Sequence, residues 1–136
     1  MGIRYLWDTN TAIYYLQQQF PPLAEKFMDD LLTEAPPCIS AITEIELLCW
    51  KAATEKDTEV LHNFINDCLV LELERPIKLR TADIRKQLKI KLPDAIIAAT
   101  ALVYGLTLIS RNTKDFEHIS GLFTVNPWDK QTSIGG

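Results

Sequence analysis

The chain alternates short apolar runs with longer stretches in which apolar residues recur every three or four positions. Two of the short runs, IRYLW at 3–7 and LVLEL at 69–73, have the length and composition of buried strands. A third, PPCIS, begins with two prolines that suit a turn leading into a strand. The pattern predicts strands within 3–7, 36–40, 69–73, 106–110 and 122–126.

Between these runs, the apolar spacing is that of amphipathic helices. After the first strand, Thr9 or Asn10 can cap a helix that runs through Ile13 and Leu16. The two prolines at 21–22 suit the start of a second helix, in which apolar residues follow every four positions. Further helices are expected at 41–53, 58–69 and about 77–88, with another headed by Asp94 and a short one within 111–119.

Strands that alternate with one or two helices are typical of an α/β domain with a mostly parallel sheet. We therefore expect a central, mostly parallel sheet flanked by helices. Such sheets place their functional residues at the carboxyl ends of the strands. Acidic residues follow the expected strands or begin the expected helices near this edge, namely Asp8, Glu44, Glu46, Asp94 and Asp115.

Helical geometry separates the two glutamates of the expected helix at 41–53. At about 100° per residue, one face of this helix carries its apolar residues, which are Ala41, Ile42, Ile45, Leu48, Cys49, Ala52 and Ala53. Glu46 borders this face, whereas Glu44 points to the other side. We therefore expect Glu46 to point inward and Glu44 to lie in solvent.

Asp94 stands before a stretch, 95–103, whose residues are nearly all apolar or small. A helix that is apolar nearly all round is usually buried. One explanation of the charge is structural, because Pro93 suits the first helical turn and a carboxylate there meets the positive end of the helix dipole. The other explanation is functional, and it requires further carboxylates at the same place.

Several carboxylates in one partly buried pocket repel each other and raise each other's pKa. A divalent cation removes this conflict, and Mg²⁺ or Mn²⁺ prefers carboxylate and water oxygens. Acidic clusters that hold two such ions about 3.5–4 Å apart are a common apparatus for cutting phosphodiesters. The acidic residues, if they converge, favour this chemistry.

The composition fits one globular domain, since 47% of the 136 residues are hydrophobic and 24% are charged. We expect this domain at 1–130 and a flexible tail at 131–136. No apolar run is long enough to span a membrane, and no signal-peptide pattern opens the chain. Three scattered cysteines indicate the reducing cytoplasm rather than a disulfide framework or a zinc site.

A net charge of −4 argues against a protein that holds nucleic acid by bulk positive charge. The segment 75–91 is nevertheless rich in basic side chains, with few acids among them. This run is either a contact surface for RNA or a solvated helix face. Its basic residues are Arg75, Lys78, Arg80, Arg85, Lys86, Lys89 and Lys91.

Four motifs, in order and at the right spacing, make the chain resemble the PIN-domain ribonucleases. Among these it resembles the VapC-like toxins of type II toxin–antitoxin pairs. The motifs are YLWDTNTAIYYL, ISAITEIELL, LPDAIIAATAL and LISRNTKDFEHISGLFTVNPW. The resemblance implies a three-layer PIN-like fold and an endoribonuclease that depends on Mg²⁺ or Mn²⁺. It also implies a homodimer, inhibited by a small antitoxin whose C-terminal segment occupies a groove near the acids.

The resemblance also assigns residues to the expected site. The catalytic and metal-binding acids fall on Asp8, Glu46, Asp94 and Asp115, although some relatives carry the fourth acid at the position of Asn112. Carboxylates or water are expected to be oriented by Thr9, Asn10, Ser40, Thr43, Ser110 and Asn112. Contacts to the RNA backbone are expected from Arg85, Lys86, Lys89, Lys91, Arg111 and Lys114. One departure is Trp50, where many relatives have glycine, and we expect it to affect packing or a partner surface.

Two other functions remain open on the sequence. An aspartate directly after a first strand, like Asp8, also suits phosphoaspartyl phosphatases and receivers. However, DTNT lacks the second aspartate of such phosphatases, and no paired acids precede Asp8 as in receivers. The other alternative is a non-catalytic module that binds RNA or protein, against which the full set of acids counts. No motif reads a base, so transfer, ribosomal and messenger RNA are all possible substrates.

Overall fold

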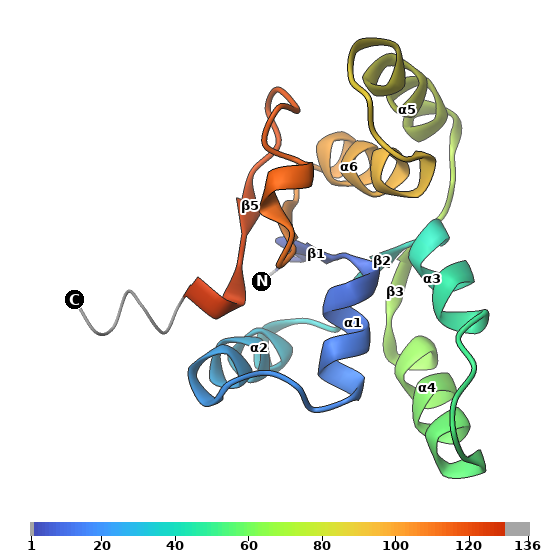
Figure 1. Cartoon of the computed structure of the whole chain (residues 1–136), viewed down its shortest axis with the longest axis vertical. Coiled ribbons are helices and arrows are strands. Elements are labelled where there is room, and N and C mark those ends of the chain that lie inside the picture. The colour runs from blue at the N-terminus through green and yellow to red at the C-terminus, as the bar shows by residue number, and fades with distance from the viewer. Residues whose placement is uncertain (1, 130–136) are drawn as a thin grey trace.

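The computed structural model describes residues 2–129 (Figure 1). The strands are β1 (Tyr5–Trp7), β2 (Cys38–Ser40), β3 (Leu69–Leu71), β4 (Thr107–Ile109) and β5 (Thr124–Val125). The helices are α1 (Thr9–Leu16), α2 (Pro22–Glu34), α3 (Ala41–Leu48), α4 (Glu55–Asp67), α5 (Arg75–Gln87) and α6 (Leu92–Tyr104). Two 3-10 helices, η1 (Thr113–Asp115) and η2 (Pro127–Asp129), complete the elements. The expected tail at 131–136, and with it the expected domain boundary at 130, lies outside the described residues.

All the strand pairs of the described chain are parallel. β4 lies between β1 and β5, and β2 pairs with β3. Because β2 also lies beside β1, the two hydrogen-bonded groups form one central layer (Figure 1). The prediction of an α/β fold with a parallel sheet is confirmed, and the carboxyl ends of the strands share one edge.

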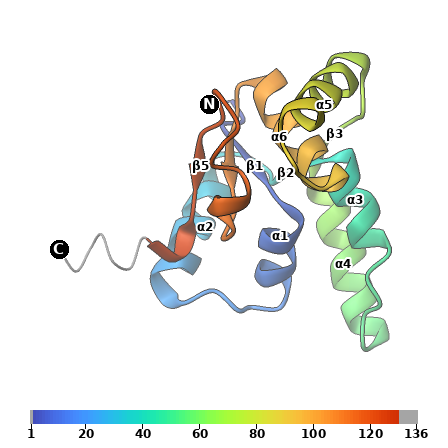
Figure 2. The same ribbon diagram turned by 45° about the horizontal axis from the view of Figure 1, so that its top comes forward.

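The alternation of side chains along the strands divides the core into two halves. One half contains Leu6, Cys38 and Leu108, which pack with residues of α5 and α6. The other contains Trp7, Ile39 and Ile109, which pack with residues of α1, α2, α3 and α4. Figures 1 and 2 show α5 and α6 on one side of the strands and α1 and α2 on the other. The sheet is therefore the middle of three layers, as the resemblance to the PIN fold implies.

Helix α6 is the main packing element beside the sheet. Every residue from Ala95 to Ala101 is buried, which agrees with its apolar sequence. Gly105 ends the helix with a φ of 66°, a left-handed conformation that favours glycine. The Leu106 N–H then donates to the carbonyl of Ala101 at 2.8 Å, so the chain turns sharply into β4.

Helix α3 differs from the prediction in length and orientation. It ends at Leu48 rather than at residue 53, and its buried residues are Thr43 and Leu47. Ile45 and Leu48, placed by the helical pattern on the buried face, are 53% and 55% exposed. The pattern was wrong because α3 packs at the side of the molecule and turns a partly polar face towards α1.

Two further features concern the length of the helices and the state of the cysteines. None of the helices in residues 2–129 is long and apolar enough to cross a membrane. Cys38, Cys49 and Cys68 all have free thiols, as expected for isolated cysteines. Burial raises the pKa of the Cys38 thiol to about 11 and that of the Cys68 thiol to about 12. These two thiols are therefore protonated and unreactive at neutral pH.

Candidate active site

Asp8 joins the end of β1 to the start of α1. Its extended backbone makes it the N-cap of α1, and its Oδ1 accepts the N–H of Thr11 at 2.8 Å. The prediction of this cap at Thr9 or Asn10 is wrong by one or two residues, because the Asp8 carboxylate accepts the N–H of Thr11 and the helix begins at Thr9. The Asp8 N–H donates to the carbonyl of Ile109 at 3.2 Å, so β4 anchors the same residue. Asp8 is thus held at the carboxyl edge of the two central strands.

The environment of Asp8 opposes its ionisation. Burial raises the pKa of its carboxyl group, and the nearby charge of Glu46 raises it further. Hydrogen bonds from Ser110 and Thr11 act in the opposite direction, because they stabilise the carboxylate. With only 6% of Asp8 exposed, burial outweighs these bonds. A carboxylate kept in such a place is typical of functional sites.

Glu46 is held by a chain of hydroxyl groups. Thr9 donates its hydroxyl proton to Glu46 Oε1 at 2.6 Å, so the Thr9–Thr43 contact at 3.0 Å must have Thr43 as the donor. Ser40 in turn donates to Thr43 at 3.2 Å. Every proton in this chain points towards Glu46, and the chain links β2, α1 and α3. These hydroxyls therefore orient the Glu46 carboxylate as an acceptor.

Glu44 and Glu46 face different parts of the molecule. Glu46 raises the pKa of Asp8 and Asp94, whereas Glu44 raises the pKa of the Cys68 thiol beside β3. Glu46 therefore lies with the other acids, and Glu44 does not. Helical spacing was right to place Glu46 with the other acids, but Glu44 is half-buried, as is Glu46, rather than in solvent. The face that the spacing predicted to be buried was also wrong.

Asp94 lies in the first turn of α6, at the same edge of the sheet. The backbone carbonyl of Lys91 begins the helix by accepting the N–H of Ala95 at 2.9 Å. Burial raises the pKa of Asp94, followed by the charges of Asp115, Asp8 and Glu46, while Lys91 lowers it. Three other carboxylates from separate parts of the chain therefore lie close enough to Asp94 to raise its pKa.

The fourth acid and its neighbours come from the loop after β4. Asp115 is exposed at the end of η1, close enough to Asp94 to raise its pKa. The N–H of Asn112 donates to Ser110 Oγ at 3.0 Å, while the Ser110 hydroxyl bonds to Asp8. Asn112 thus acts through its backbone, and its side chain and that of Asn10 make no hydrogen bond to a carboxylate among the described residues.

Two cavities flank the four acids. The first, of about 520 Å³, is lined by Asp94 and Asp115 together with Lys89, Lys91, Lys114 and His118. The second, of about 320 Å³, is lined by Asp8, Asn10, Tyr14, Arg111 and Asn112. We call them the lysine cavity and the Arg111 cavity. Both belong to the same edge of the sheet, so an extended ligand can cross the acids from one to the other.

The residues expected to bind RNA fall into three groups. Lys89, Lys91 and Lys114 line the lysine cavity, and Arg111 lines the other. The Nε of Arg85 instead donates to the carbonyl of Ile90 at 3.1 Å, which braces the loop between α5 and α6. Lys86 is exposed and lines neither cavity.

Two polar residues that line these cavities, Tyr14 and His118, were not predicted from the sequence. Tyr14 lies four positions after Asn10 in α1, a spacing that places both on one helix face, so a signal for it was present. His118 follows η1 in an irregular segment, where no periodic pattern indicates which way a side chain points.

The donor set suits a hard divalent cation. No three His, Cys, Asp or Glu side chains within residues 2–129 are arranged to hold an ion as they stand. However, the four acids supply only carboxylate oxygens, and Mg²⁺ is often bound through one or two carboxylates with several waters. Asp8 and Asp94 are also destabilised as anions by burial and by their neighbours. A cation among them would relieve this, so the residues fit Mg²⁺ or Mn²⁺.

A parallel three-layer fold with four acids at its carboxyl edge defines the class of PIN-type domains. The model of the PIN domain family matches residues 5–122, and the chain belongs to this family. Among its relatives is the "tRNA(fMet)-specific endonuclease VapC" of Salmonella typhimurium, which is 30% identical over 88% of this chain and 95% of the relative.

Solved structures agree with this assignment. The DNA-bound VapBC of Salmonella typhimurium superposes with a TM-score of 0.79 at 28% identity, covering 93% of this chain and 99% of that one. A toxin–antitoxin complex from Klebsiella pneumoniae gives 0.72 at 31% identity, covering 90% and 97%. Within the PIN family, the chain is therefore VapC-like.

Proposed function

We propose that this protein is a metal-dependent endoribonuclease and the toxin of a toxin–antitoxin pair. The observation that carries the proposal is the position of Asp94 at one sheet edge, where burial raises the pKa of its carboxyl group and the charges of Asp115, Asp8 and Glu46 raise it further. Relatives named as endonucleases and ribonucleases support the same chemistry. Asp8, Glu46, Asp94 and Asp115 would hold one or two Mg²⁺ or Mn²⁺ ions.

The protein's own residues have separate tasks in this proposal. The chemistry that a bound ion supplies is a water of lowered pKa and a counter-charge for the leaving oxygen. The hydroxyl chain from Ser40 to Thr9 keeps Glu46 in one orientation, and Thr11 and Ser110 do the same for Asp8. Removing groups that orient metal ligands in this way commonly lowers metal affinity or activity by roughly tenfold to a hundredfold.

One experiment separates this function from its alternatives. Purified protein is incubated with labelled RNA, with and without Mg²⁺, and internal cleavage is read on a gel. Cleavage only with Mg²⁺ supports the endoribonuclease. Binding without cleavage under both conditions would indicate a non-catalytic module, and hydrolysis of a phosphomonoester without cleavage would indicate a phosphatase. Transfer RNA is the first substrate to test, because a relative is named for tRNA(fMet).

The lysine cavity supplies a prediction about RNA binding. Replacing Lys89, Lys91 and Lys114 with glutamine should weaken binding and flatten its salt dependence, with a slope smaller by about 0.7 for each lost phosphate contact. The matched control replaces Lys26, Lys51 and Lys56, which are exposed, line neither cavity and lie outside the basic run at 75–91. Equal effects of the two triple variants would show that only net charge matters.

The partners implied by the resemblance are a second copy of the chain and a small antitoxin. Neighbouring solved structures are toxin–antitoxin complexes, which supports the antitoxin. For the second copy we propose the face of α3 on which Ile45 and Leu48 are exposed. The free thiols support a cytoplasmic location for the assembly.

The α3 face supplies a prediction about assembly. Replacing both Ile45 and Leu48 with aspartate should convert a dimer into a monomer, because desolvated charges would face each other across the contact. Light scattering after size exclusion measures the change. A matched control replaces Leu79 of α5 and Phe123, which precedes β5, with aspartate, since both are exposed apolar residues away from α3. A double aspartate variant of α3 that remains dimeric would place the dimer contact elsewhere.

A further inference from the structure

Arg111 is held against two aromatic rings beside the acids. Its guanidinium carbon lies 4.7 Å from the ring centre of Trp128 and 5.7 Å from that of Tyr14. The two rings meet edge to face, with centres 5.2 Å apart. A guanidinium stacked in this way is restrained in its plane but keeps its N–H groups available at the edge.

The backbone on both sides of this cluster is also tied together. Asn126 donates its side-chain N–H to the carbonyl of Arg111 at 3.4 Å and accepts the N–H of Trp128 at 3.0 Å. Phe20 packs on Trp128 with ring centres 4.7 Å apart. The position of the rings is therefore set by α1, by the turn after α1 and by η2, rather than by Arg111 itself.

The charge of Arg111 has no anionic partner within the described part of the protein. Its guanidinium forms no ion pair there, and its side chain makes no hydrogen bond there. Arg111 is also absent from the charges that shift the pKa of Asp8 and Asp94. A cation held against two rings, with free donors, thus lines the Arg111 cavity, which Asp8 also lines.

The residues that line this cavity are suited to bind the parts of a nucleotide. The arginine suits a phosphate, to which a guanidinium can donate two parallel hydrogen bonds. The amides of Asn10 and Asn112 are exposed, and each can both donate and accept, as a base edge or a 2′-hydroxyl requires. The volume of about 320 Å³ is at the lower end of the range for small-ligand pockets.

We propose that the Arg111 cavity binds the nucleotide next to the scissile phosphate, with Arg111 on the RNA backbone and the rings of Tyr14 and Trp128 as its positioning groups. This proposal rests on the proposed ribonuclease function. RNA then crosses the acids from the lysine cavity to the Arg111 cavity. Arg111 also offsets the repulsion between the RNA phosphates and the four carboxylates.

The test measures binding of a fluorescein-labelled 12-nucleotide oligouridylate by anisotropy in EDTA, over a range of KCl concentrations. Arg111→Ala should weaken binding by about tenfold to a hundredfold, with a salt slope smaller by about 0.7. Arg111→Lys should restore the salt slope but not the affinity, because lysine lacks the planar group that stacks.

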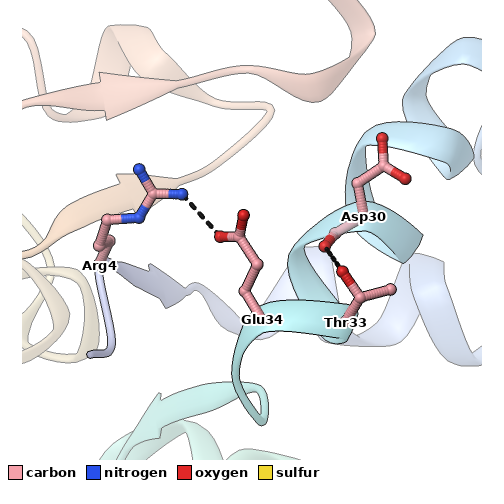
Figure 3. A network of polar contacts seen from close by, with 4 residues as sticks. All are labelled: Arg4, Asp30, Thr33 and Glu34. Carbon is pink, nitrogen blue, oxygen red and sulfur yellow. Dashed lines mark hydrogen bonds and ion pairs between the residues drawn. The ribbon is translucent and has the colours of Figure 1, made fainter. Parts of the chain in front are cut away.

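Arg4 provides a matched control. It is also an exposed arginine over a tyrosine ring, 5.5 Å from the ring centre of Tyr5. However, it pairs with Glu34 at 2.8 Å (Figure 3), and it precedes β1, whereas Asp8 follows this strand. Arg4→Ala should leave both the affinity and the salt slope unchanged. If Arg111→Ala binds like Arg4→Ala while wild-type protein binds and cleaves RNA, the cavity proposal is wrong and the ribonuclease stands. If wild-type protein neither binds nor cleaves RNA, the proposed function itself fails.

A double-mutant cycle tests the positioning role of the rings. Trp128→Leu should weaken binding in the wild-type background but add nothing in the Arg111→Ala background, because it acts through Arg111. Trp128→Phe should keep most of the affinity, since it keeps a ring. If Trp128→Leu does not fold, Tyr14→Leu completes the same cycle. An equal loss in both backgrounds would show that the rings do not act through Arg111.

Discussion

Replacing Asp94 with asparagine is expected to reduce RNA cleavage by about a hundredfold or more, the range seen when one preorganised electrostatic group is removed. The substitution keeps the size of the side chain and removes one of four converging charges. In the absence of metal, the variant should be at least as stable as the wild type, because burial and three carboxylates oppose the Asp94 anion. Loss of activity together with retained stability is typical of functional residues.

If Asp94 only stabilises the helix dipole of α6, a different result is expected. A residue that only complements the helix dipole would lose at most about 1 kcal/mol of stability on substitution, and cleavage would remain. Single-turnover cleavage in Mg²⁺ and denaturant unfolding in EDTA measure the two quantities. Glu44→Gln is the matched control, since Glu44 faces Cys68 rather than the acids. Near-normal cleavage by Asp94→Asn would remove Asp94 from the site.

Millimolar Mn²⁺ or Mg²⁺ is expected to raise the melting temperature of the protein. An ion that binds only the native state at about a hundredfold excess over its dissociation constant adds roughly 2.7 kcal/mol of stability. Thermal scans with and without Mn²⁺, at equal ionic strength, measure this effect. Asp94→Asn should show a smaller increase. An unchanged melting temperature in wild-type protein would be evidence against a metal site.

The same carboxylates give the metal-free protein a characteristic pH dependence. The folded pKa of Asp8 and of Asp94 lies above the ordinary value of 3.8, so the native state binds more protons than the unfolded state between 3.8 and the raised value. The free energy of unfolding contributed by these two groups therefore falls as pH rises through this window. Comparing wild type with Asp94→Asn in EDTA isolates the contribution of Asp94.

The residues at the carboxyl edge of the sheet could be predicted, because their positions depend on the order of strands and helices along the chain. Short apolar runs separated by amphipathic helices predict a parallel sheet, and a parallel sheet brings the carboxyl ends of its strands together. Asp8 and Ser110 directly follow two of these strands, and Asp94 lies at the head of the most apolar helix. Their arrival at one edge follows from their positions relative to the elements, without knowledge of any long-range contact.

The hydroxyl chain to Glu46 was only partly visible in the sequence. The resemblance named Ser40, Thr43 and Thr9, and the spacing of Ser40 and Thr43 suits a helix cap. That Thr9 is the direct donor to Glu46 depends on how α1 packs on α3. The direction of a hydrogen-bond chain requires the relative placement of both helices, which no local pattern contains.

The sequence by itself determined the alternation of strands and helices and the parallel direction of the strands, because apolar periodicity and chain order decide these locally. It also indicated acids near one edge of the sheet, and the resemblance selected Asp8, Glu46, Asp94 and Asp115 among them. Only the tertiary structure decided which apolar stripe of α3 would be covered, leaving Ile45 and Leu48 exposed. It also brought Arg111 onto the rings of Tyr14 and Trp128, which come from α1 and the last 3-10 helix. The physical reason is the same in both cases. Periodicity reports which residues favour burial, whereas the packing of distant elements selects the neighbours that each residue meets.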